Sequence, residues 1–180
     1  IKKYYNLNNM KIAICGKMCS GKSTIANMLK EYDDRFKIFS FGNKIKVLAN
    51  ELFDMDLKNK DRSLMISIGS KMREINPDVW VNYIIKKTKD EEFCIIDDLR
   101  FQNELDILEQ NGWKIISLNI SEELQTDRIK CLYKNNYDDH LKNRSHLSEE
   151  NCLIFKDKPL IIDSSFNLDD IKETIIKTIF

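Results

Sequence analysis

The order of apolar and polar residues predicts strands that alternate with amphipathic helices along the whole chain. Short unbroken apolar runs are typical of buried parallel strands, and each is followed by a segment whose apolar residues recur at helical spacing. The predicted strands are residues 11–14, 36–41, 93–96, 114–120 and 160–163. The predicted helices are residues 24–32, 42–53, 62–75, 79–87, 101–111, 122–133 and 168–179. Such alternation indicates a parallel sheet that is covered by helices on both faces.

Residue types at the helix ends support these boundaries. Ser121 and Asn167 each precede a predicted helix, and their side chains can cap a helix N-terminus. Asn76, Pro77 and Asp78 predict a further helix start, with Asn76 as the cap and Pro77 in the first helical position. These signals divide the chain into elements of ordinary length.

The first predicted strand leads into the sequence GKMCSGKS at residues 16–23. This sequence matches the G-x-x-x-x-G-K-[ST] pattern of a phosphate-binding loop, and the strand before it and the helix after it are the expected context. The glycines let main-chain N–H groups face a phosphate, while the lysine reaches the terminal phosphates and the serine binds magnesium. We therefore expect ATP and Mg²⁺ as cofactors. The residues expected to bind them are Gly16, Lys17, Ser20, Gly21, Lys22, Ser23 and Thr24.

The loop and the alternating elements together predict an α/β protein with the P-loop NTPase fold. Its expected core is a central parallel five-stranded sheet with helices on both faces, and its ligands are expected at the carboxyl ends of the strands. The chain has 180 residues, without an internal repeat or a linker, which indicates a single domain.

Composition narrows the classes of function. The 29 basic and 29 acidic side chains cancel, so no nucleic-acid-binding surface is expected. No apolar run approaches the ~20 residues that span a bilayer, so we expect a soluble, cytoplasmic protein without a membrane partner. The five cysteines lack a C-x-x-C pair and are expected to be free thiols. Zinc binding by Cys15 and Cys19 is not expected, because companion ligands are missing.

A second candidate site follows the buried run at residues 93–96, where Asp97, Asp98 and Arg100 occur together. Successive strand residues face opposite sides of a sheet, so only one of the two carboxylates is expected to face the magnesium. The residues alone do not decide which one. A helix cap or a turn is the alternative interpretation of such a pair.

Several segments resemble the deoxynucleoside monophosphate kinases of bacteriophages and large DNA viruses. The run IIDDLRFQNELDIL is similar to the D-V-R-F-x-N-E segment of that family. Other similar segments are SFGNKIKVLANELF at residues 40–53, ISIGSKMREINPDVWVNYI at 66–84 and RSHLSEE at 144–150. Together with the phosphate loop, the resemblance covers most of the chain in the order of the family. Two positions depart from it, because many members have a basic residue at Cys19 and some have Asp at Ser23.

The resemblance implies a kinase that transfers the γ-phosphate of ATP to a deoxynucleoside monophosphate, for dNTP synthesis. It implies an acceptor-binding insertion at about residues 42–88 and a lid at about residues 128–150. It also implies that Asp98 and Arg100 lie at the active-site edge. The residues expected to bind the metal are Ser23 of the loop motif and Asp98. The residues expected around the acceptor are Phe41, Lys44, Arg73, Trp80, Tyr83, Asn103 and Glu104. For Phe41 and Trp80, a place in the core is the alternative.

Phosphoryl transfer also needs cations that close over the two substrates. The segment 134–150 is polar and charged and is expected to be mobile. The basic residues that can supply this lid are Arg128, Lys130, Lys134, Lys142 and Arg144. The residues expected to be catalytic are Lys22, Asp98, Arg100, Arg128 and Arg144. Neither His140 nor His146 has the setting of a general base, and His146 is expected to order the lid.

Two other functions remain open. A different small-molecule kinase, such as a dephospho-coenzyme A kinase, fits the loop, although the segments around Trp80 and Arg100 weigh against it. A nucleotide-dependent switch needs an N-K-x-D element, and the similar string at residues 43–46 ends in lysine. We expect small-molecule nucleotides as the partners and leave pairing of two copies open. If the protein is viral, the host cytoplasm is its expected location.

Overall fold

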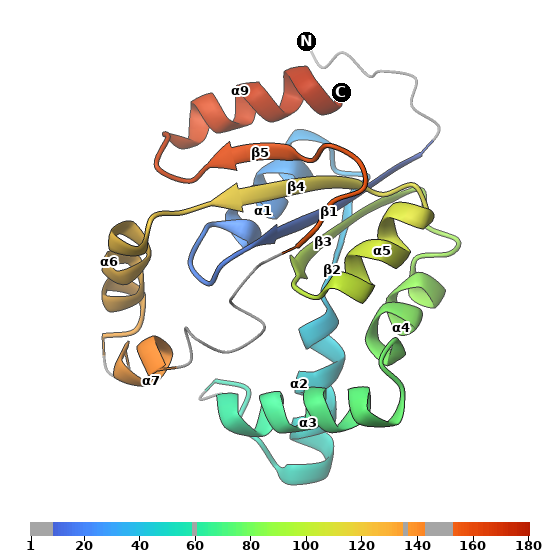
Figure 1. The fold of residues 1–180 in the computed structure, drawn as a ribbon, viewed down its shortest axis with the longest axis vertical. Coiled ribbons are helices and arrows are strands. Elements are labelled where there is room, and N and C mark those ends of the chain that lie inside the picture. Colours follow the sequence, from blue (N-terminus) through green and yellow to red (C-terminus); the bar gives the residue numbers. More distant parts are fainter. Residues whose placement is uncertain (1–8, 59–60, 135–136, 143–152) are drawn as a thin grey trace.

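Five parallel strands form one sheet in the order β2-β3-β1-β4-β5 (Figure 1). The computed structural model describes residues 9–58, 61–134, 137–142 and 153–180, without the side chains of residues 139 and 142. The strands are β1 (Met10–Gly16), β2 (Lys37–Phe39), β3 (Phe93–Leu99), β4 (Lys114–Asn119) and β5 (Leu160–Asp163). The predicted five-stranded parallel sheet is therefore confirmed.

Helices cover both faces of this sheet, which is also as predicted. On one face, Ile12 and Ile14 of β1 lie in a core cluster with residues of α1 (Lys22–Tyr32) and α9 (Leu168–Ile179). On the other face, Ala13 and Cys15 lie in a second cluster with residues of α4 (Val79–Lys87) and α5 (Gln102–Gln110). The alternation of β1 between the two clusters explains why its apolar run is unbroken.

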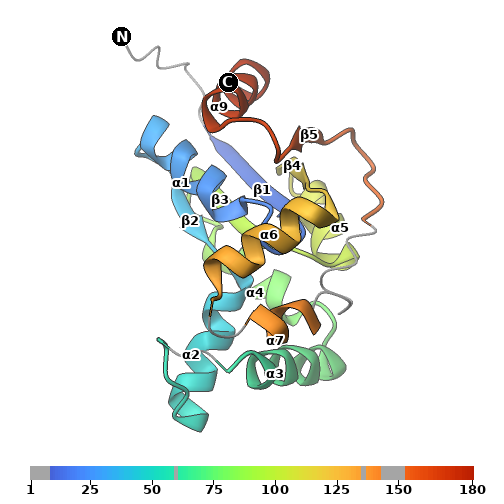
Figure 2. The ribbon, with the colours of Figure 1, turned by 90° about the vertical axis from the view of Figure 1, so that its left-hand side faces the viewer.

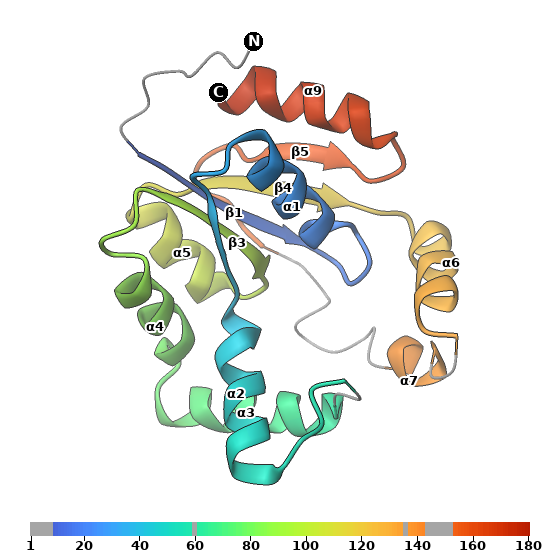
Figure 3. The same cartoon turned by 180° about the vertical axis from the view of Figure 1, so that it is seen from behind.

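Four further helices lie beyond the carboxyl ends of the strands or extend away from the sheet. Helix α2 (Phe41–Phe53) follows β2 and extends away from the sheet, and α3 (Arg62–Ile75) lies crosswise against α2, apart from the sheet (Figure 3). Helix α6 (Glu122–Leu132) follows β4, and the short α7 (Tyr137–Lys142) lies between α6 and α3 (Figure 2). These helices surround the edge at which β1 enters the phosphate loop.

The central position of β1 brings the candidate residues together. It pairs with β3 on one side and with β4 on the other, with Cys15 opposite Leu99 and Ser117. The phosphate loop therefore begins between the ends of β3 and β4, which is where the topology of such sheets places ligands.

Helix boundaries agree with the sequence prediction at several caps and differ at one. The side chains of Ser121 and Asn167 cap α6 and α9, as predicted. Asn76 is not the cap of α4, because α4 begins after Asp78. Asn76 instead ends α3, and its side chain accepts a hydrogen bond from the N–H of Asp78 at 3.0 Å. Within the described part of the chain, no helix has the length and apolar character that crossing a membrane requires.

Candidate nucleotide-binding site

Two glycines allow the phosphate loop its shape for different reasons. A Cβ on Gly16 would lie 2.7 Å from Ser20 Oγ and 2.9 Å from the carbonyl oxygen of Leu118, so the close approach excludes any side chain. Gly21 has open space around it but a φ of +100°, which residues with a Cβ rarely adopt. Both positions of the motif are therefore explained by local geometry.

The side chain of Lys22 lies inside this loop. Its ammonium group donates hydrogen bonds to the carbonyl oxygens of Gly16, at 2.7 Å, and Lys17, at 2.8 Å. The buried Ser20 Oγ lies in the same loop and has no partner among the described residues. An ammonium group and an unpartnered hydroxyl both fit the oxygens of a polyphosphate. The loop residues therefore fit a nucleoside triphosphate, which is the ligand that the motif predicts.

Asp97 is the carboxylate that lies beside the loop. Ser23 Oγ donates to Asp97 Oδ2 at 2.8 Å, so a hydroxyl and a carboxylate are brought together from α1 and β3. Burial raises the pKa of Asp97, and the charge of Asp98 raises it further. Two hard oxygen donors beside a phosphate loop fit Mg²⁺. Ser23 and Asp97 are therefore the residues that can hold the ion.

Asp98 has a different place, which corrects its assignment as a metal ligand. Its carboxylate accepts hydrogen bonds from the N–H groups of Phe41 and Gly42, both at 2.9 Å, and from Ser40 Oγ at 2.7 Å. These contacts cap the N-terminus of α2, where a negative charge is also favoured by the helix dipole. The capping alternative for the pair thus describes Asp98, and Asp97 is the carboxylate that lies beside Ser23.

Arg73 of α3 is held beside the turn from β3 to α5. Its Nη2 donates to Glu104 Oε1 at 3.0 Å, and its guanidinium lies 4.0 Å from the ring centroid of Phe101. Glu104 is 2% exposed and also accepts from the N–H groups of Arg100 and Phe101, each at 3.2 Å. Burial raises the pKa of Glu104, while the nearby Arg73 acts against that rise. Glu104 therefore supports Arg73 and caps α5, a position that differs from the predicted contact with the acceptor.

Three other residues predicted to contact the acceptor are structural in this conformation. Phe41 and Trp80 are each 3% exposed and belong to the core, so they take the alternative place and not the expected one around the acceptor. Trp80 Nε1 donates to the carbonyl of Gly69 at 3.1 Å and so joins α4 to α3. Asn103 Nδ2 donates to the carbonyl of Pro77 at 3.0 Å and to Asp78 Oδ1 at 2.8 Å, which fixes α5 to the start of α4.

For the remaining residues, the expected roles in binding and catalysis stay predictions. Tyr83 is half-buried against the second core cluster, and Lys44 is half-buried on α2. Arg100 directly follows β3, and Thr24 is exposed on the first turn of α1. No contact of these residues decides their roles.

Arg128 does not occupy the predicted lid position. Its guanidinium donates to the carbonyl oxygens of Cys19, at 3.2 Å, and Ser164, at 2.7 Å, so it supports the phosphate loop from outside. Lys130 and Lys134 are exposed on α6 and just after it. Arg144 and the side chain of Lys142 lie outside the described residues, as does His146, and their predicted roles stay predictions.

The sequence did not point to Arg62, which the structure places next to the loop. Its Nη1 lies 3.2 Å from Met18 Sδ and 3.2 Å from His140 Nδ1 of α7. Arg62 therefore brings a guanidinium from the start of α3 to the phosphate loop. No motif marks it, because its position depends on how α3 packs against α2 and α4.

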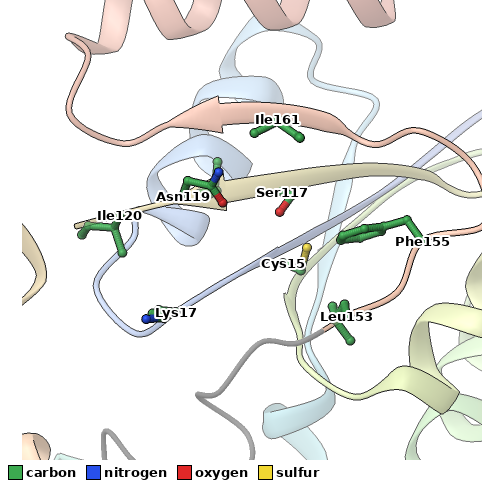
Figure 4. Close-up of a pocket in the computed structure, with 9 residues that line it drawn as sticks. Cys15, Lys17, Ser117, Asn119, Ile120, Leu153, Phe155 and Ile161 are labelled. Atoms are coloured by element: carbon green, nitrogen blue, oxygen red, sulfur yellow. The ribbon is translucent and has the colours of Figure 1, made fainter. Parts of the chain in front are cut away.

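A cavity of about 360 Å³ opens beside the loop on the face of the sheet that α5 partly covers (Figure 4). Cys15, Ser117 and Ile161 lie side by side across three strands and line it from the sheet. Among its nine lining residues only Lys17 is charged. Its other lining residues are Leu118, Asn119, Ile120, Leu153 and Phe155.

Comparison with known proteins assigns the chain to a family. The family described as an AAA domain matches residues 12–151, and the chain belongs to it. No curated protein matches the sequence. Each of the three solved structures compared here covers 94% of this chain at 14% identity. They are a gluconokinase from Sinorhizobium meliloti 1021 (TM-score 0.58, 91% of its chain), a shikimate kinase from Aquifex aeolicus vf5 (0.58, 95%) and a sugar kinase from Janibacter sp. HTCC2649 (0.61, 93%). At this identity the likeness shows a shared fold, and it confirms the predicted P-loop NTPase fold.

Proposed function

We propose that the protein is an ATP-dependent kinase that transfers the γ-phosphate of ATP to a deoxynucleoside monophosphate. The observation that carries the proposal is the placement of two guanidinium groups on α3. Arg62 reaches Met18 of the phosphate loop, and Arg73 is fixed beside the end of β3. An acceptor that already carries a phosphate needs cations on its own side, because two anions must approach each other. The resemblance in sequence supports the same class of acceptor.

The donor side of the reaction is served by the loop. Its main-chain N–H groups and Lys22 bind the β- and γ-phosphates and align them. Ser23 and Asp97 would hold Mg²⁺, which would supply further neutralisation of the phosphate charge. Because an acceptor phosphate is already ionised, its oxygen can attack without a general base.

The acceptor side is served by Arg73. Its side chain is 21% exposed and is held by Glu104 at 3.0 Å, so an acceptor phosphate would contact the exposed part of this side chain. Glu104 and Phe101 restrict the guanidinium to one orientation, so little conformational entropy is lost when a phosphate binds. We propose that Arg62 adds a second contact to the phosphate that is transferred.

A kinase for a neutral or carboxylate-bearing small molecule is the second candidate. The names gluconokinase and shikimate kinase of similar structures favour it, and so does the nearly uncharged cavity around Ser117 and Asn119. This cavity lies on the sheet face beside the loop and is large enough for a small acceptor.

A panel of acceptors separates the two candidates. The purified protein is incubated with ATP, Mg²⁺ and each ribo- or deoxyribonucleoside monophosphate, gluconate, shikimate or dephospho-coenzyme A, and the products are separated by anion-exchange chromatography. We expect diphosphate from one or more deoxynucleotides, and none from the Lys22→Ala protein. Phosphorylation of gluconate or shikimate alone would overturn the proposal. In the active reaction, Arg73→Lys should raise the KM of the acceptor about tenfold or more, whereas the exposed control Lys71→Arg should not change it.

A further inference from the structure

Three consecutive carbonyl groups of the phosphate loop are held from outside by side chains that the sequence motif does not contain. Gln125 Nε2 of α6 donates to the carbonyl of Met18 at 3.0 Å. Arg128, also on α6, donates to the carbonyl of Cys19 at 3.2 Å, and Ser164 Oγ donates to the carbonyl of Ser20 at 2.8 Å. Gln125 is fully buried and Ser164 is 3% exposed, so solvent does not compete for the contacts with Met18 and Ser20, whereas the contact of Arg128 is partly buried.

Ser164 is itself fixed by its neighbours. Its N–H donates to the carbonyl of Asn119 at 2.8 Å, which continues the pairing of β4 with β5. Its carbonyl accepts from Arg128 Nη2 at 2.7 Å. The main-chain N–H, the carbonyl and the hydroxyl of Ser164 are thus all used, and they join the turn after β5, α6 and the loop into one hydrogen-bonded unit.

The direction of these carbonyls determines where the loop amides point. In a planar trans peptide, the carbonyl of one residue and the N–H of the next point in opposite directions. The chain has no cis peptide bond among its described residues. Holding the carbonyls of Met18, Cys19 and Ser20 outward therefore turns the N–H groups of the three following residues inward, toward the position of the phosphates. The N–H of Ser20 shows this direction, because it donates across the loop to the carbonyl of Lys17 at 3.2 Å.

We propose that Gln125, Arg128 and Ser164 are positioning residues that keep the phosphate loop in its nucleotide-binding shape. We call these three side chains the loop bracket. Without the loop bracket, the peptides of residues 18–21 can rotate, and ATP must then reorder them when it binds, at a cost in affinity. The proposal rests on the part of the proposed function in which the loop binds ATP, and it is independent of the acceptor.

The test is equilibrium binding of ATP and Mg²⁺ to the full chain by isothermal titration calorimetry, with thermal unfolding measured in parallel. Gln125→Met and Ser164→Ala each remove one hydrogen bond to the loop, and each should weaken ATP binding about two- to tenfold. The same substitutions at exposed positions, Gln110→Met on α5 and Ser165→Ala after β5, are the matched controls and should bind ATP like the wild type.

Two readouts separate a positioning role from simple stabilisation. Gln125→Met also removes a buried Oε1 that has no partner among the described residues, so its melting temperature should change little while its ATP affinity falls. In the active reaction, the KM of ATP should rise in both variants and the KM of the acceptor should not. ATP affinity equal to that of the wild type in both variants would overturn the loop bracket alone. Failure of the wild type to bind ATP would overturn the proposed function as well.

Discussion

The hydroxyl of Ser23 donates a hydrogen bond of 2.8 Å to Oδ2 of Asp97 and so joins the start of α1 to β3. The next residue, Asp98, binds the N-terminus of α2 instead. Two adjacent carboxylates thus make different contacts, so we expect Asp97→Asn and Asp98→Asn to have different effects.

Asp97→Asn should lower kcat/KM about 100-fold or more, because it removes the anionic oxygen that can hold Mg²⁺ and leaves the fold intact. Asp98→Asn should instead lower the free energy of unfolding by about 1–2 kcal/mol, since it weakens a helix cap. Magnesium-dependent kinetics and urea unfolding of both variants check this. A loss of magnesium dependence in Asp98→Asn, with little effect in Asp97→Asn, would contradict the assignment.

Lys22→Ala should abolish phosphoryl transfer while the protein stays folded. The ammonium of Lys22 lies inside the loop, where it donates to the carbonyls of Gly16 and Lys17 and can contact the terminal phosphates. Transfer is measured with radiolabelled ATP, and folding by circular dichroism. Lys30→Ala, at an exposed position of the same helix, is the control and should keep full activity. Near-normal transfer by Lys22→Ala would refute the proposed function.

Trp80→Phe should lower stability without changing the binding of the acceptor. The indole is 3% exposed and donates to the carbonyl of Gly69, so the variant loses a buried hydrogen bond and some packing, about 1–3 kcal/mol in unfolding free energy. Thermal denaturation and the KM of the acceptor are measured together. A large rise in KM at unchanged stability would instead support the expectation that Trp80 contacts the acceptor.

Glu104 should make the stability of the wild type depend on pH. Its pKa is raised by burial above the ordinary value of 4.5, so the folded state binds its proton more tightly than the unfolded state. The stabilisation by that proton is complete below the unfolded pKa and is lost as the pH rises through the folded pKa.

We therefore compare the unfolding free energies of the wild type and Glu104→Gln between pH 7 and pH 4. The difference should move in favour of the wild type as the pH falls. Glu173→Gln is the control of opposite sign, because a hydrogen bond from Lys177 lowers the pKa of Glu173. If the difference in unfolding free energy between the wild type and Glu104→Gln does not change with pH, the pKa of Glu104 is not raised in the folded state.

The fold was predictable because two strong local signals agree. The phosphate-loop motif placed a strand and a helix around residues 16–23, and the alternation of apolar runs with amphipathic segments implied the parallel sheet. Helix caps such as Ser121 and Asn167 act through contacts within three residues, so they could also be found from the sequence.

The side-chain partners in the site were less predictable, because they depend on contacts between distant elements. Local sequence does not decide between Asp97 and Asp98, because their contacts depend on the register of β3. It also does not predict the contact of Arg62 with Met18, because that contact depends on how α3 packs in the fold. Arg128 was expected in the lid because it is basic and precedes a polar segment. Its helix instead packs beside the loop, where two carbonyl groups accept its hydrogen bonds.

The register of β3 makes the site intolerant of changes in strand length. Ile96 lies opposite Ala13 and Leu99 opposite Cys15, so the pairing shifts at Asp97 and Asp98, and their contacts depend on that register. Deletion or insertion of one residue between Phe93 and Ile96 would exchange the sides on which the two carboxylates emerge. The carboxylate of Asp97 would then face α2, and the carboxylate of Asp98 would face Ser23. Homologous sequences of different length should therefore carry their insertions and deletions before Phe93 or after Arg100. The number of residues from Phe93 to Arg100 should stay constant.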